Sequence, residues 1–103
     1  MVSVDMEYIR EWALEAVNAE RQRQEDMKAD GRFKFTCADP GAMTNAEKLT
    51  VLVEEVGEVA RVLIEYDDPQ LAGTTGSARL REELAQVAAV AVAWLEALWE
   101  PTA

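Results

Sequence analysis

Two long stretches of this sequence carry apolar residues every three or four positions, the spacing that places side chains on one face of an α-helix. The first stretch spans residues 49–64 and the second spans residues 80–98. Such stripes are typical of amphipathic helices that bury one face. The apolar positions are Leu49, Leu52, Val53, Val56, Ala60, Leu63 and Ile64 in the first stretch, and Leu80, Leu84, Val87, Ala91, Trp94, Leu95 and Leu98 in the second. The sequence therefore predicts an all-α fold.

The chain has 103 residues, which predicts a single domain over residues 1–103. We expect helices at about 4–28, 45–66 and 78–99, with a loop at 29–44 and a turn-rich linker at 67–76. Thr44 and Glu47 have the spacing of a capping box, which marks the start of the second helix. Ser77 is the expected N-cap of the third helix.

Half of the residues are hydrophobic, which is more than a small monomer needs. From Val87 to Trp99 the third helix is apolar nearly all round, and such a helix is buried on most sides. Three helices of one short chain can hardly cover it. We therefore expect an antiparallel helical bundle completed by homo-oligomerisation, as a homodimer or homotetramer, although a monomer with an exposed C-terminal helix is the alternative.

The formal net charge of −10 argues against nucleic acid or an anionic membrane as the main partner. The most apolar run, Leu84–Leu98, is too short to cross a bilayer. With a single cysteine, Cys37, and no apolar leader at the N-terminus, a cytoplasmic location is expected. The absence of histidine excludes histidine-based catalysis and leaves carboxylates and metals as the main catalytic option.

Acidic and amide side chains interrupt the two apolar stretches at matching positions. Glu55 and Glu58 lie one helical turn apart, and so do Glu83 and Gln86. Two helices packed side by side would direct all four groups at one spot, where carboxylates repel unless a cation neutralises them. Oxygen ligands of this kind suit Mg²⁺, with Mn²⁺ as a possibility. The alternative is that these residues form ordinary solvated helix faces.

Basic residues are concentrated near the end of the first helix and in the loop that follows. Five of the ten lie between positions 21 and 34, namely Arg21, Arg23, Lys28, Arg32 and Lys34. This excess predicts contacts with a phosphorylated ligand, with Arg21, Arg23, Lys28, Lys34 and the nearby Gln24 as substrate-binding candidates. The alternative is that the basic groups balance nearby acids. Trp12, Phe33 and Phe35 are candidates for stacking on a base, or for the core.

The order of these motifs resembles the MazG-like family of the all-α nucleoside triphosphate pyrophosphatase superfamily. That family has an EExxE stretch followed by ExxD. Residues 54–58 match the first part, and Glu83 matches the acid of the second, but Gln86 stands where the family usually has Asp. The segments EKLTVLVEEVGEVARVL, LREELAQVAAVAVAWLEAL and AERQRQ also look like family sequence. The resemblance covers about residues 15–98.

The resemblance implies Mg²⁺-dependent hydrolysis of a (d)NTP to the monophosphate and pyrophosphate, at sites built from helices of two or more subunits. It implies that Glu55, Glu58 and Glu83 bind metal, that Gln86 falls on a fourth ligand position, and that Glu54 is a ligand or orients the attacking water. Other branches, such as phosphoribosyl-ATP pyrophosphatase or dimeric dUTPase, are alternatives. The loss of a carboxylate at Gln86 leaves a non-catalytic nucleotide- or protein-binding helical oligomer as a further alternative.

Overall fold

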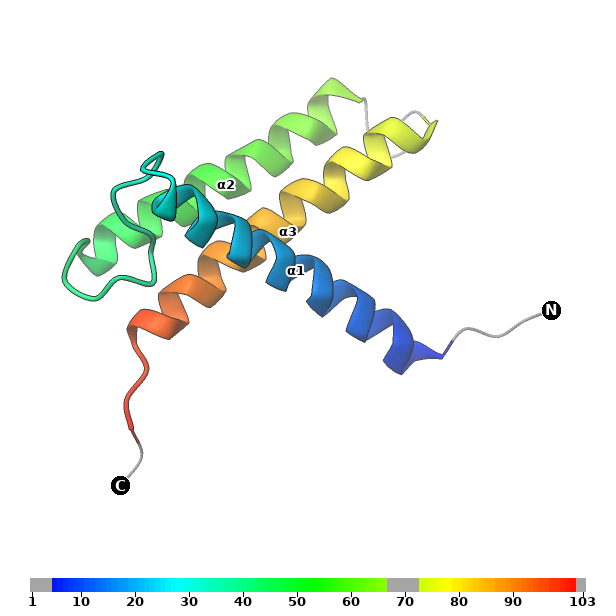
Figure 1. The fold of residues 1–103 in the computed structure, drawn as a ribbon. Helices are drawn as coiled ribbons and strands as arrows, with labels where there is room; N and C mark the ends of the chain where they lie inside the picture. Colours follow the sequence, from blue (N-terminus) through cyan, green and yellow to red (C-terminus); the bar gives the residue numbers. More distant parts are fainter. Residues whose placement is uncertain (1–4, 67–72, 102–103) are drawn as a thin grey trace.

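The computed structural model describes residues 5–66 and 73–101, and within these ranges all regular secondary structure is helical (Figure 1). Helix α1 is Met6–Ala29, α2 is Asn45–Glu65 and α3 is Gly73–Ala97. The prediction of an all-α fold is therefore confirmed. The expectation for residues 67–72 lies outside the described residues.

Local sequence sets the ends of the first two helices. Asp5 is the N-cap of α1, and its side chain accepts a hydrogen bond from the backbone N–H of Glu7. The chain leaves α1 at Asp30 and turns at Gly31, whose φ of +80° favours glycine. Helix α2 opens with the expected capping box, in which Thr44 and Glu47 bond to each other's backbone N–H groups.

Helix α3 is longer than the sequence predicted. It begins at Gly73, whereas the sequence analysis placed residues 73–76 in a linker and Ser77 at the N-cap. Both expectations are wrong, because Ser77 lies inside the helix. Gly76 is buried there, which indicates that tertiary packing holds this first turn against the low helix propensity of glycine.

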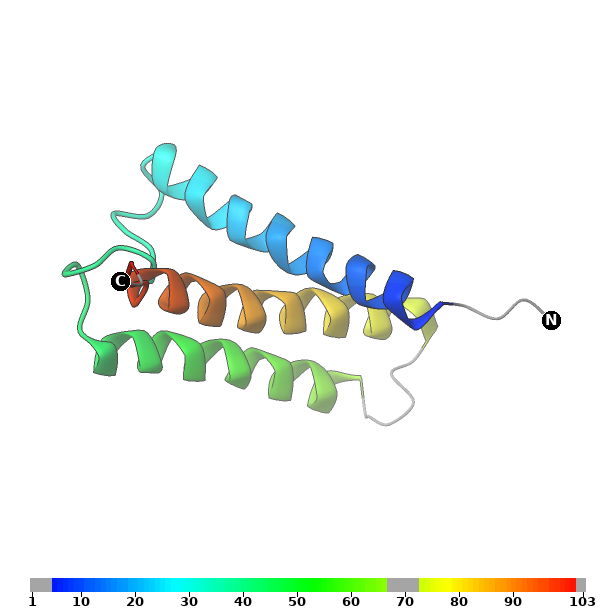
Figure 2. The same ribbon diagram turned by 90° about the horizontal axis from the view of Figure 1, so that it is seen from below.

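Helix α3 is the central element of the fold. It packs against α1 on one side and α2 on the other, and no helix-to-helix contact between α1 and α2 occurs in the described chain (Figure 2). Ala89 and Ala93 are fully buried on α3, where their small side chains permit close approach of neighbouring helices. Cys37 from the loop and Val90 join Ala93 in the main apolar cluster. The loop at 30–44 thus contributes Cys37 to the core, while most of its other residues are exposed.

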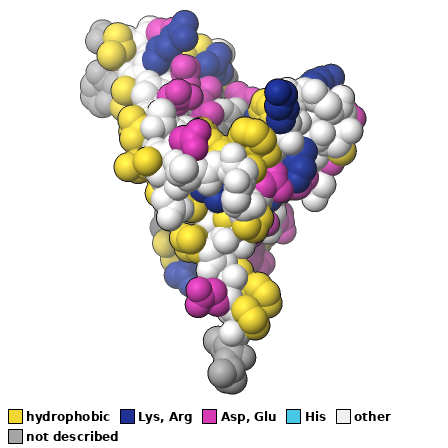
Figure 3. Space-filling model, turned by 90° about the vertical axis from the view of Figure 1, so that its left-hand side faces the viewer, with side chains coloured by type: hydrophobic (Ala, Val, Ile, Leu, Met, Phe, Trp, Pro, Cys, Tyr) yellow, Lys and Arg dark blue, Asp and Glu magenta, His cyan; other side chains and the backbone are white. Residues whose placement is uncertain are grey.

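Many large apolar side chains remain on the surface (Figure 3). Ile64 is 79% exposed, Leu95 is 68% exposed and Trp99 is 75% exposed. The accessible surface is 7618 Å², whereas a compact monomer of this mass exposes about 5,800 Å². The single chain therefore leaves an unusually large area open to solvent.

None of the helices in residues 5–66 and 73–101 combines the length and the apolar character that crossing a membrane requires.

Candidate functional site

An acidic pair joined by an amide lies where α2 and α3 pack together. With its amide nitrogen facing the acids, Gln86 donates to Glu83 Oε2 at 3.1 Å and to Glu55 Oε2 at 3.2 Å. The opposite orientation would set the amide oxygen against acceptor oxygens, so hydrogen-bond chemistry selects the first one. Glu83 is only 8% exposed, and its other oxygen lies 3.5 Å from Arg79 Nη2. We call Glu55, Glu83 and Gln86 the carboxylate–amide cluster.

The surroundings of this cluster disfavour negative charge. Burial raises the pKa of the Glu55 carboxyl above its ordinary value, and the charges of Glu83 and Glu58 raise it further. The positive charge of Arg23 acts in the opposite direction. Arg23 therefore offsets only part of the negative charge of these carboxylates, and a cation placed beside them would be attracted by the remainder.

Glu58 and Glu54 lie near the carboxylate–amide cluster without joining its hydrogen bonds. Glu58 has a side chain that is 48% exposed and lies 3.9 Å from Arg61, while Glu54 is exposed. Across residues 5–66 and 73–101, no three acidic, cysteine or histidine side chains are grouped closely enough to hold a metal ion. The expected convergence of four groups is therefore reduced to three, Glu55, Glu83 and Gln86.

These three residues nevertheless fit the chemistry of one hard divalent cation. Mg²⁺ is commonly held by one or two carboxylates while water and substrate phosphates complete its coordination. The Glu55 and Glu83 carboxylates both lie within hydrogen-bond distance of one amide, and that amide also carries an oxygen. The two carboxylates thus supply oxygen ligands, and the amide oxygen would join them only after a half-turn of the Gln86 amide.

A mostly apolar pocket of about 240 Å³ adjoins the carboxylate–amide cluster. Glu55 and Gln86 form part of its wall, and Phe33 and Phe35 enter it from the loop. The other lining residues are Arg23, Gln24, Thr36, Cys37, Met43, Val51 and Val90. We call this the loop pocket. It combines aromatic rings with charged and amide groups, a composition that suits a flat ligand with a polar or phosphorylated tail.

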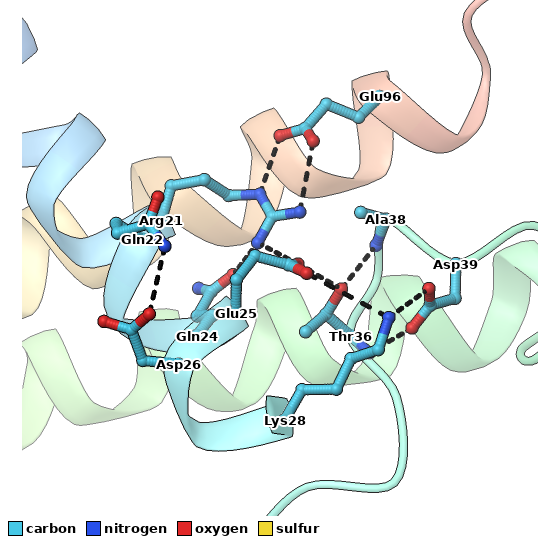
Figure 4. A network of polar contacts seen from close by, with 10 residues as sticks. All are labelled: Arg21, Gln22, Gln24, Glu25, Asp26, Lys28, Thr36, Ala38, Asp39 and Glu96. Carbon is cyan, nitrogen blue, oxygen red and sulfur yellow. Dashed lines mark hydrogen bonds and ion pairs between the residues drawn. The ribbon is translucent and has the colours of Figure 1, made fainter. Parts of the chain in front are cut away.

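The structure gives Arg21 a different role from the one predicted. Its guanidinium donates to both oxygens of Glu96 on α3, from Nε at 2.6 Å and from Nη2 at 3.1 Å (Figure 4). Nη1 also lies 2.6 Å from Glu25 Oε2. Burial acts to lower the pKa of Arg21, but the hydrogen bonds that Arg21 donates to Glu96 and Glu25 outweigh this effect, and the pKa is raised. Arg21 is 9% exposed and links α1 to α3 rather than facing a ligand.

Lys28 is similarly occupied by the loop. Its Nζ lies 2.7 Å from Asp39 Oδ1, and Asp39 Oδ2 accepts from the Thr36 backbone N–H at 2.8 Å (Figure 4). These two bonds hold the pKa of Asp39 below its ordinary value, with the bond from Lys28 having the larger effect. The Thr36 hydroxyl donates to Glu25 at 3.1 Å, which joins this set to Arg21. We call the set around Arg21, Glu25, Lys28, Thr36, Asp39 and Glu96 the loop network.

The remaining substrate-binding candidates fall into two groups. Arg23 and Gln24 line the loop pocket, although Arg23 also bonds to Glu20 at 2.8 Å and Gln24 accepts from Arg21 at 3.5 Å. Lys34 is exposed on the loop and does not line that pocket. Of the aromatic candidates, Trp12 lies in a separate groove between α1 and α3.

The sequence analysis gave no role at the site to two buried residues, Cys37 in the loop and Lys48 on α2. Cys37 lines the loop pocket, and burial raises the pKa of its thiol, although the charges of Lys48 and Arg21 act to lower it. Lys48 is only 3% exposed and donates to the carbonyl oxygen of Asp39 at 3.5 Å. The only sequence signal for the loop's burial is the apolar spacing of Phe33, Phe35 and Cys37 between polar residues.

Fold and site together define an all-α chain with a carboxylate–amide cluster beside an aromatic pocket. Comparisons of the chain with protein-family models, curated proteins and solved structures found no match.

Proposed function

We propose that this chain is a nucleoside triphosphate pyrophosphohydrolase that uses Mg²⁺, or Mn²⁺, to cleave a (d)NTP to the monophosphate and pyrophosphate. The observation that carries the proposal is that Glu55 and Gln86 belong both to the carboxylate–amide cluster and to the wall of the loop pocket. A nucleotide whose base enters that pocket has its phosphates within reach of the cluster. The resemblance of residues 54–58 and 83–86 to the MazG-like motifs supports the same activity.

In this proposal, each part of the chain has a distinct task. Glu55, Glu83 and the Gln86 oxygen hold the cation, while Phe33 and Phe35 stack on the base and Arg23 contacts phosphate. When bound, the cation neutralises phosphate charge and lowers the pKa of water. Water attacks the α-phosphorus, the bond to the bridging oxygen breaks, and pyrophosphate leaves with that oxygen. The resemblance implies that Glu58 is a metal ligand like Glu55 and Glu83, and that Glu54 is a ligand or orients the attacking water.

The proposed enzyme is a homodimer or homotetramer. The surface of the single chain exceeds that of a compact monomer by about 1,800 Å², while each partner in a standard interface loses about 800 Å². The exposed side chains of Ile64, Leu95 and Trp99 supply apolar contacts for such an interface. Sedimentation equilibrium tests this part, and a monomer at micromolar concentration would contradict it.

Pyrophosphate release from a panel of NTPs and dNTPs tests the activity. We expect Mg²⁺-dependent turnover of at least one nucleotide, and a loss of about 100-fold or more in Glu83→Gln, because a ligand charge is removed. The matched control is Glu82→Gln, which makes the same change at the neighbouring, exposed position of α3. Circular dichroism verifies that both variants are folded. Equal activity in the two variants, or no turnover of any nucleotide, would refute the proposal.

A second candidate is a nucleotide-binding oligomer that does not cleave its ligand. The observation in its favour is that a neutral amide, in place of a third carboxylate, completes the cluster. Calorimetry with a nucleotide and Mg²⁺ distinguishes the two functions, since this candidate binds the nucleotide and leaves it intact.

A further inference from the structure

Helix α2 carries an apolar face that the rest of the described chain leaves largely open. The helix forms an outer layer of the molecule, with α3 between it and α1 (Figure 2). With about 100° of rotation per residue, six apolar or small residues share one side of this helix. We call them the α2 stripe, namely Leu49, Val53, Val56, Gly57, Ala60 and Ile64. All six are exposed, with Leu49 at 49%, Val53 at 59% and Ile64 at 79%.

The α2 stripe and the loop pocket lie on different sides of the helix. Val51 and Glu55 are the two residues of α2 that line the pocket. Ala60, in the stripe, is rotated by about 180° around the helix axis from Val51. A partner that covers the stripe therefore leaves the loop pocket open.

Gly57 indicates that another helix approaches this face. Glycine inside a helix costs about 1 kcal/mol relative to alanine. Within the described residues, no atom lies within 4 Å of the position that a Cβ at Gly57 would occupy. The single chain thus gains no close packing from glycine at this position. Close approach of another backbone is a setting that favours glycine, and a second molecule can supply it here.

We propose that two copies of this chain pair antiparallel through the α2 stripe, across a two-fold axis beside Gly57. Successive stripe residues are separated by 4, 3, 1, 3 and 4 positions, a spacing that reads the same in both directions. A two-fold interface requires such a self-complementary surface. Pairing about the centre of the stripe sets Leu49 opposite Ile64 of the second copy. It also sets Val53 opposite Ala60 of the second copy, and the two Gly57 residues meet at the axis.

Charge and exposed area both favour a second copy as the occupant. In this register Arg61 lies two positions along the helix axis from Glu54 of the second copy, on the same edge of the interface, so opposite charges adjoin. The chain exposes about 1,800 Å² more than a compact monomer, and each partner in a standard interface buries about 800 Å². The pairing gives the homodimer proposed above a definite interface, and it does not depend on the nucleotide chemistry.

Sedimentation equilibrium of the full chain measures the pairing. We expect a wild-type dimer at micromolar concentration, and a dissociation constant about 100-fold or more higher in Val53→Glu, because a two-fold interface contains each substitution twice. The matched control is Leu14→Glu on α1, since Leu14 is 56% exposed and Val53 is 59% exposed. This control should change the dissociation constant by less than about threefold. A monomeric wild type, or equal weakening in the two variants, would overturn the proposal.

Gly57→Lys tests the axis with a change that suits the separated chain. Lysine has a better helix propensity than glycine, and the chain leaves room for a side chain at this position. Circular dichroism should therefore show no loss of helix. In the dimer, two ammonium groups would meet where the backbones approach, so we expect pairing to weaken by about 100-fold. An unchanged dissociation constant would contradict the close approach at Gly57.

Disulfide formation tests the antiparallel direction. Val53→Cys combined with Ala60→Cys should give covalent dimers on mild oxidation, because these positions face each other across the interface. Val53→Cys alone should not, since the two copies of position 53 lie about 10 Å apart along the axis. Wild type, whose single cysteine Cys37 is buried, is the background control. Equal cross-linking of the single and the double variant would indicate parallel helices and refute the pairing.

Failure of the proposed function has a different signature. A dimer that meets these three expectations, but releases no pyrophosphate from any nucleotide, would refute the enzyme and leave the α2 interface in place. An active enzyme whose Val53→Glu variant remains fully dimeric would refute this interface and leave the activity in place.

Discussion

Breaking the link between Arg21 and Glu96 is expected to destabilise the fold far more than breaking an exposed ion pair. Arg21 is 9% exposed, and Glu96 receives two of its N–H groups. Glu96→Gln removes the negative charge and leaves one good acceptor for a guanidinium that still has Glu25 as a partner. Because the Glu96 side chain is 48% exposed, solvent screens part of the loss.

We expect Glu96→Gln to lower the free energy of unfolding by about 1–2 kcal/mol, less than the loss for a fully buried pair. For a domain of this size, that loss corresponds to a fall of roughly 4–12 °C in the midpoint. Thermal unfolding followed by circular dichroism, at one fixed protein concentration, measures it.

The matched control is Glu65→Gln on α2. Glu65 also accepts from an arginine Nε, that of Arg61 at 2.9 Å, but the two side chains are 46% and 68% exposed. The thermal unfolding midpoint of Glu65→Gln should differ from that of wild type by less than about 2 °C. If Glu96→Gln shifts the midpoint no more than Glu65→Gln does, the assignment of Arg21 to a structural role is wrong.

Three more predictions address the loop. Phe33→Ala should weaken nucleotide binding about 10-fold in calorimetry while Mn²⁺ affinity stays unchanged, and a loss of both would instead indicate a collapsed site. Asp39 has a folded-state pKa below its unfolded value, so its stabilising contribution is present at neutral pH and disappears as pH falls through the folded-state pKa. The urea midpoint should therefore fall less on acidification from pH 5 to about pH 3 in Asp39→Asn than in wild type, whereas parallel curves would contradict this. The raised pKa and burial of Cys37 predict slow reaction with a thiol reagent at pH 7 and faster reaction in urea, and equal rates would disprove its place in the core.

The sequence predicted those parts of the fold that depend on residues close to one another along the chain. The capping box at Thr44 and Glu47 is a local pattern, and it is present at the start of α2. The start of α3 was predicted wrongly because glycines at positions 73 and 76 favour turns, and only packing against the other elements explains a helix there.

The candidate site was predictable to the extent that helical spacing controls it. The spacing predicted that Glu55, Glu58, Glu83 and Gln86 would meet. The structure places the Gln86 amide within hydrogen-bond distance of Glu55 and Glu83, whereas Glu58 stays outside these contacts. The spacing could not show that Arg21 finds Glu96, since 75 positions separate the two in the sequence. Pairing between distant charges depends on how helices cross, which no local pattern encodes.

The attachment of α1 has a consequence for how ligands reach the site. Among the helices, α1 touches α3 alone, while α2 and α3 together carry the carboxylate–amide cluster. A tilt of α1 about α3 would change both the entrance beside Arg23 and Gln24 and the distance of the Arg23 charge from Glu55. Access to the loop pocket and the charge balance of the acidic pair are therefore coupled through one helix.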